Sequence, residues 1–190
     1  MDKRAQIKQR LKQFKSLTKE QKFKEFQFCL LTPQSNAQRC WQAVEEISKI
    51  KNPTEKQISE ILSTKTRFHN TKAKRIIRAK VTFNNVWPKI RAGGWAPSKI
   101  IDLRSHLAKQ VNGYGLKETS HFLRNIGLSN NQIAILDRHI LRNLKEEKIK
   151  SPKHYLKIEQ KFLSIAKSKK IPADELDLLW WSQENGEIFK

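Results

Sequence analysis

The chain has 190 residues, 37% hydrophobic and 30% charged, and its 39 lysines and arginines outweigh 18 acidic residues to give a net charge of +21. This length fits one compact unit or two small lobes, and so large a charge of one sign indicates a polyanionic partner, nucleic acid first, although a lysine-rich proteome would give the same excess. The sequence contains no apolar run long enough to span a membrane, no apolar signal-peptide core, no His/Cys spacing typical of zinc sites and only two cysteines, too few for a four-cysteine iron–sulfur cluster. We therefore expect a cytoplasmic protein that uses neither metal nor cofactor.

The first third of the chain is expected to be helical. Apolar residues recur at helical spacing, and the second helix stops at Pro33, after which Ser35 or Asn36 can cap the next one. Cys29 and Cys40 lie among apolar neighbours and are expected to be buried and free. The expected helices cover residues 7–17, 19–31, 37–49 and 54–62.

A dense basic cluster follows, and then a break in the helical pattern. The cluster could line a phosphate track, or it could be an ordinary solvated helix face. Trp87-Pro88 and the segment 93–97 contain the prolines and glycines typical of a loop, so we expect a loop between them. The cluster comprises Arg67, His69, Lys72, Lys74, Arg75 and Arg78.

The next segment, about 99–127, has the pattern of a helix-hairpin-helix. A helical run over 98–110 leads into Gly113-Tyr114-Gly115, and a second helical pattern runs from Leu116 to a stop at Gly127. Glycine permits a tight turn and lets backbone N–H groups approach an anion at the positive end of the second helix. Gly113 and Gly115 are therefore candidate contacts to a DNA phosphate.

Two polar residues give this region possible chemistry. Lys117 lies in the first turn after the hairpin, and Asp137, 20 positions later, is expected to cap a helix over 138–147. A lysine amine can attack a sugar carbon and form a Schiff base, and a nearby carboxylate can stabilise the positive charge that develops. Taken singly, Lys117 could be a phosphate contact and Asp137 only a helix cap.

Three separated stretches resemble the archaeal-type 8-oxoguanine DNA glycosylase/AP lyases of the helix-hairpin-helix, endonuclease III-like superfamily. The resemblance implies that Lys117 is the nucleophile and that Asp137 assists it. The resemblance is closer in the C-terminal half of the chain than in the N-terminal half. The stretches are Lys117–Asn125, Ala134–Arg142 and the ending from Leu176-Asp-Leu-Leu-Trp-Trp181 through Gly186 to Lys190.

Five more residues have candidate roles, those of Gln34, Trp181 and Lys190 through the same resemblance and those of His139 and Asp177 through their positions beside the matched residues. Gln34 matches the position that enters the gap left by an extruded base, although it could be an ordinary loop residue, and His139 could contact a phosphate. In the final helix, Trp181 would form a wall of the base pocket and Asp177, one turn earlier, could accept a hydrogen bond from a purine N–H. Lys190, the last residue, would close the pocket.

We therefore predict an all-α protein of two lobes with the active site in a cleft between them. One lobe would comprise residues 37–135 and end in the hairpin; the other would combine 1–36 with 136–190. The expected function is excision of 8-oxoguanine from double-stranded DNA and β-elimination at the resulting site, by a monomer acting in the nucleoid. Alternatives are a glycosylase of the same fold for another oxidised base and a non-catalytic helix-hairpin-helix DNA-binding protein.

Overall fold

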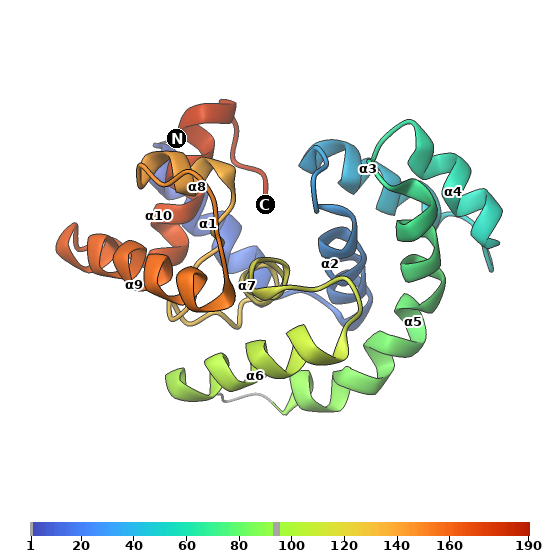
Figure 1. Ribbon diagram of the computed structural model, residues 1–190, viewed down its shortest axis with the longest axis horizontal. Coiled ribbons are helices and arrows are strands. Elements are labelled where there is room, and N and C mark those ends of the chain that lie inside the picture. Colours follow the sequence, from blue (N-terminus) through green and yellow to red (C-terminus); the bar gives the residue numbers. More distant parts are fainter. Residues whose placement is uncertain (1, 93–95) are drawn as a thin grey trace.

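The computed structural model describes residues 2–92 and 96–190, and within these ranges it contains ten α-helices and no strand (Figure 1). The all-α prediction is confirmed. None of the described helices is long and apolar enough to cross a bilayer. The helices are α1 (Lys3–Lys15), α2 (Lys19–Leu31), α3 (Ala37–Ser48), α4 (Glu55–Ser63), α5 (His69–Arg91), α6 (Pro97–Gln110), α7 (Leu116–Asn125), α8 (Arg138–Asn143), α9 (Pro152–Ser168) and α10 (Ala173–Asn185).

Side chains at the N-cap position account for the starts of five of the ten described helices. Thr18 and Thr54 form capping boxes with the glutamines three residues later, which satisfy the N–H groups of the N-cap residue and of the third helical residue in α2 and α4. Of the two candidates for α3, Asn36 is the cap, and its side chain accepts from the Arg39 N–H at 3.0 Å.

The structure corrects two predicted boundaries. Helix α5 continues through Pro88 to Arg91, where a loop was expected. Val86 and Ile90 are buried there, and Trp87 packs on Phe83 with the ring centroids 5.3 Å apart. This burial outweighs the penalty of about 3 kcal/mol for a proline inside a helix. The expected glycine-rich loop at 93–95 lies outside the described residues.

Helix α8 is the second correction, since it ends at Asn143 rather than at residue 147. Lys145 adopts a positive φ of 57°, and the Glu146 N–H donates to the Leu141 carbonyl. This bond closes the C-terminus of the helix early and turns the chain into the segment that leads to α9.

The core divides into a large cluster and two smaller ones. Helices α2 to α7 share the large cluster, α8 to α10 share the second, and α1 packs with α10 in the third. The expected division had put residues 1–36 with the C-terminal helices; α1 packs there, whereas the buried side chains of α2 lie in the large cluster. Helix α7 lies centrally between the two sides of the molecule (Figure 1).

A buried ion pair joins the two larger clusters. Arg104 of α6 and Glu159 of α9 are each 1% exposed, and their Nη2 and Oε2 atoms are 2.9 Å apart. Glu159 also accepts from the Ala134 N–H at 2.8 Å, at the point where the chain passes from one cluster to the other. The relative placement of hairpin and C-terminal helices is thus fixed by several directional bonds.

Candidate active site

The turn between α6 and α7 has the conformation that its glycines predict. Gly113 has a φ of +100°, and a Cβ there would lie 2.8 Å from the Arg75 side chain, so another residue would be both strained and crowded. Between the glycines, buried Tyr114 donates its hydroxyl to the Phe26 carbonyl at 2.9 Å. The hairpin is therefore anchored to α2 at its tip.

Lys117 lies in the first turn of α7 with its side chain 27% exposed. Its Nζ is 2.9 Å from Oε1 of Glu118, and the other oxygen of Glu118 accepts from the Gly115 N–H at 3.1 Å. One carboxylate therefore connects the lysine amine to the hairpin glycine. The sequence analysis missed Glu118, although a glutamate three residues after an N-cap can accept from the N-cap N–H, the half of a capping box that needs no N-cap side chain.

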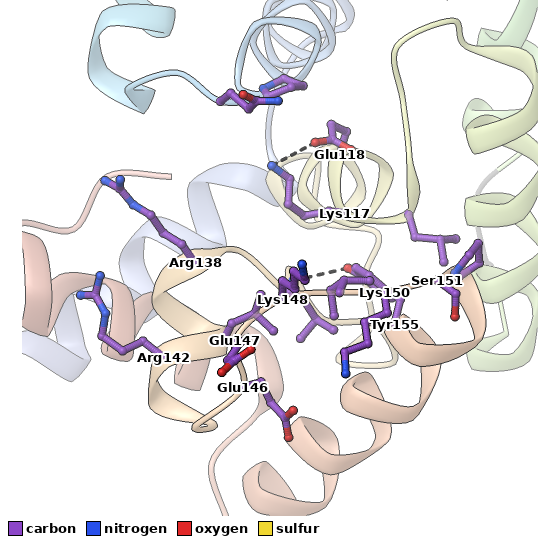
Figure 2. A pocket seen from close by; sticks show the side chains of 17 residues that line it. Lys117, Glu118, Arg138, Arg142, Glu146, Glu147, Lys148, Lys150, Ser151 and Tyr155 are labelled. Atoms are coloured by element: carbon purple, nitrogen blue, oxygen red, sulfur yellow. Dashed lines mark hydrogen bonds and ion pairs between the residues drawn. The ribbon is translucent and has the colours of Figure 1, made fainter.

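A cavity of about 830 Å³ opens beside Lys117. Figure 2 shows Lys117 of α7 and Arg138 and Arg142 of α8 around it, with the segment from Glu146 to Ser151 completing the wall. Gln34, from the loop before α3, lines the same cavity. The cavity volume falls in the range of about 300–1,000 Å³ typical of ligand sites.

Asp137 occupies the N-cap of α8, as predicted. Its Oδ1 atom accepts from the backbone N–H groups of His139 and Ile140 at 2.8 and 2.9 Å. Its neighbours in the chain, Leu136 and Arg138, both line the cavity that contains Lys117. The structure thus brings the start of α8 and the hairpin lysine to one cavity, although Asp137 itself is not among the residues that line it.

Gln34 and His139, two further predicted site residues, both lie in the described part of the chain. Gln34 is exposed and has a positive φ of 54°. His139 is held within the protein: Nδ1 is 2.5 Å from Glu184, and Nε2 accepts from Arg138 at 3.3 Å. Because Glu184 also binds Arg142 at 2.7 Å, a phosphate contact by His139 would require this network to rearrange.

Residues 7–171 match the protein family described as 8-oxoguanine DNA glycosylase. The chain belongs to this family. It is 38% identical to the 8-oxoguanine DNA glycosylase/AP lyase of Fusobacterium nucleatum, with 97% of this chain and 91% of the relative aligned. The protein of the same name from Methanocaldococcus jannaschii is 33% identical over 96% of this chain and 89% of its own length.

Solved structures agree with this assignment. The chain matches the Methanocaldococcus jannaschii 8-oxoguanine glycosylase/lyase in complex with 15mer DNA containing 8-oxoguanine, with a TM-score of 0.86, 29% identity and coverage of 100% and 94% of the two chains. The 8-oxoguanine DNA glycosylase of Thermotoga maritima matches with a TM-score of 0.83, 29% identity and coverage of 98% and 92%. The resemblance inferred from the sequence is confirmed.

In this family member, the end of the chain is an ordered part of the molecule. Lys190 is 5% exposed, its Nζ pairs with buried Glu25, and it lies 3.4 Å from the ring centroid of Trp41. The Phe189 carbonyl accepts from Arg10 at 2.9 Å. The other Glu25 oxygen accepts from Asn125 at 2.8 Å, so the terminal lysine closes a buried polar network.

Aromatic rings surround the terminal segment. The Phe189 ring centroid is 6.2 Å from those of Phe28 and Trp181, and Trp181 in turn lies 6.2 Å from His139. Trp181 and Lys190, both predicted pocket residues, are thus joined through Phe189. Sequence reasoning missed Phe28 and Trp41, because α2 and α3, which supply them, are far in the chain from the C-terminal segment.

Asp177, the third predicted pocket residue, is buried in an ion pair with Arg124. It is 7% exposed, and its Oδ2 lies 3.3 Å from Nη2 of Arg124. Burial raises the pKa of Asp177 to about 7, while the positive charge of Arg124 opposes the shift. Near neutral pH its carboxyl group is therefore protonated in part and can donate as well as accept a hydrogen bond.

Proposed function

We propose that the protein is a bifunctional DNA glycosylase and AP lyase that excises 8-oxoguanine from duplex DNA. The observation that carries the proposal is the position of Lys117: it follows the hairpin directly and lines a cavity that also contains Gln34 and the start of α8. In such a place an amine can meet a deoxyribose whose base has left the stack, while the hairpin holds the adjacent phosphate.

The proposed chemistry proceeds through a covalent intermediate. The neutral amine of Lys117 attacks C1′ of the sugar, and the bond from C1′ to the base breaks as the base departs with a proton. Opening of the sugar ring gives an iminium ion; loss of a C2′ proton then expels the 3′ phosphate, and water hydrolyses the imine to release Lys117. Glu118, 2.9 Å from the amine, holds it beside the hairpin.

The remaining site residues serve binding and charge stabilisation in this proposal. Asp137 stabilises the positive charge on the sugar, Gln34 enters the gap in the stack, and His139 contacts a phosphate after exchanging its bond to Glu184. The backbone at Gly113 and Gly115 binds a phosphate.

The base pocket would be formed by the C-terminal residues. Trp181 provides a stacking surface, Lys190 closes the pocket, and Asp177 takes part in base recognition through a carboxyl group that can be neutral. We further propose that the helices on the two sides of the Lys117 cavity act as two lobes. We also propose that the protein acts as a monomer on nucleoid DNA in the cytoplasm.

The proposal is tested with duplexes that carry either 8-oxoguanine, an oxidised pyrimidine or no lesion, under single-turnover conditions. We expect release of free 8-oxoguanine together with a nicked strand ending in the unsaturated sugar aldehyde. Faster excision of the pyrimidine lesion would instead indicate a glycosylase of the same fold for another base. Tight binding with no product from any duplex would leave only a DNA-binding protein.

Binding to undamaged duplex should weaken steeply as salt is raised, because the net charge is +21 and the hairpin is expected to hold the phosphate backbone. Each phosphate neutralised contributes a slope of about −0.9 in log K against log salt, so several contacts give a slope of several units. Fluorescence anisotropy at a series of KCl concentrations measures this slope. A flat response would contradict backbone-dominated binding.

Removing Ile188–Lys190 should reduce excision of 8-oxoguanine far more than binding to undamaged DNA, because it opens the predicted pocket. The deletion also leaves the carboxylate of Glu25, which is 3% exposed, without its lysine partner. Breaking a buried ion pair in this way lowers the stability of a protein by about 3–5 kcal/mol. The deletion should therefore be made together with Glu25→Gln and compared with the wild-type protein, because Glu25→Gln alone would leave the buried Lys190 without its partner.

Trp181→Ala should act in the same direction as this deletion, by removing a wall of the pocket. Single-turnover rates, with circular dichroism as the folding control, measure both effects. Normal excision by a folded truncation would show that the terminal segment has only a structural role.

A further inference from the structure

Lys72, in the first turn of α5, is one of the most deeply buried charged residues of the described chain, with 1% of its surface exposed. The sequence analysis had placed it in a basic cluster that faces phosphates or solvent. In the structure its side chain points into the protein, so this residue cannot contact DNA as the others of the cluster could.

The Lys72 ammonium is bound by the loop between α2 and α3. Its Nζ donates to the carbonyl oxygens of Leu31 and Pro33 at 2.7 and 2.9 Å, and to Oγ of Ser35 at 2.8 Å. A protonated lysine has three N–H donors, and here three acceptors from the last residue of α2 and the loop after it meet them. Burial lowers the pKa of Lys72 to about 8, which leaves the ammonium form predominant at neutral pH.

Gln34 lies between two of these acceptors. It has a left-handed backbone with a φ of 54°, a conformation that residues other than glycine adopt reluctantly, and its side chain lines the cavity with Lys117. The bonds from Lys72 hold the residue before Gln34 and the residue after it. The Arg67 N–H adds a further bond to Ser35 at 2.9 Å.

We propose that Lys72 is a positioning residue for Gln34. By binding the loop, Lys72 holds the one backbone conformation that points the Gln34 side chain into the DNA stack. This inference rests on the proposed function, since Gln34 needs a fixed position only if it must fill the gap of an extruded base. A loop free to relax from the strained conformation would let Gln34 withdraw and the base return. Lys72 acts through the loop and does not touch the reacting atoms.

The test compares Lys72→Met with Lys80→Met, which removes the same charge from an exposed position of the same helix. Two reactions are measured: single-turnover excision of 8-oxoguanine from duplex, and β-elimination at an abasic site in single-stranded DNA, which needs no extrusion. We expect Lys72→Met to slow duplex excision by about tenfold to a hundredfold, as for other small misplacements of site residues, with single-strand cleavage almost unchanged. Lys80→Met should change neither reaction.

A double-mutant cycle links the effect to Gln34. Added to Gln34→Ala, Lys72→Met should slow duplex excision little further, because the residue that it positions is already absent. Fluorescence of 2-aminopurine placed opposite the lesion should report the same loss of extrusion in both single variants. Ser35→Ala removes only one of the three acceptors and should give a smaller effect in the same direction, which keeps the test valid if Lys72→Met unfolds.

Three results would overturn the inference: normal duplex excision by folded Lys72→Met or Ser35→Ala, equal losses in the duplex and single-strand reactions, or additive losses with Gln34→Ala. If the wild-type protein cleaves abasic single strands but excises no base from any duplex, the proposed glycosylase function itself is wrong. The two failures are therefore distinguishable in one set of reactions.

Discussion

Replacing Lys117 by glutamine should abolish both base release and strand cleavage while binding to duplex DNA stays nearly unchanged. An amide cannot form the imine that the proposed reaction requires. The Lys117 side chain is 27% exposed and forms an ion pair with the adjacent Glu118, so the fold should tolerate the change. Single-turnover assays and anisotropy measure the two properties.

The matched control for this variant is Lys157→Gln, which removes an equal charge from an exposed position on α9. It should retain excision and cleavage. If Lys117→Gln releases 8-oxoguanine at the wild-type rate, another group carries out the displacement and Lys117 is only a phosphate contact.

Asp137→Asn should slow excision by about a hundredfold to a thousandfold, the size of effect seen when one group that stabilises transition-state charge is removed. Both capping bonds at Asp137 end on Oδ1, and asparagine keeps an oxygen that can accept them. The charge is thus removed while the helix start is preserved, so thermal unfolding should hardly change.

Asp137→Ala provides the comparison for this second prediction, because it loses the charge and the cap together. It should be as slow as Asp137→Asn and also less stable by about 1 kcal/mol. If Asp137→Asn excises the base at the wild-type rate, Asp137 serves only as a helix cap.

Features encoded over a few residues were predictable from the sequence. Gly113-Tyr114-Gly115, the cap at Asp137 and the capping threonines act on their own helices, so their patterns lie within one turn of chain. The hairpin was therefore predicted together with its lysine, and the resemblance to the family followed from the same stretches.

Features that depend on distant parts of the chain were not predictable. Lys190 pairs with Glu25 across 165 positions, and Lys72 binds a loop about 40 positions earlier in the chain. No local pattern marks either lysine as buried, because hydrophobic periodicity cannot show that several acceptors converge on one amine. The end of α5 was not predictable for a similar reason. Local propensity ends the helix before Pro88, whereas burial of the neighbouring residues extends it to Arg91.

Borohydride trapping is the decisive test of Lys117 as the nucleophile. The protein is mixed with duplex DNA containing 8-oxoguanine in the presence of sodium borohydride, which reduces a Schiff base to a stable amine, and the cross-linked peptide is identified by mass spectrometry. We expect an adduct on Lys117, formed with the lesion duplex and absent with the undamaged one. An adduct on a different lysine, or excision of 8-oxoguanine without any trapped complex, would contradict this prediction.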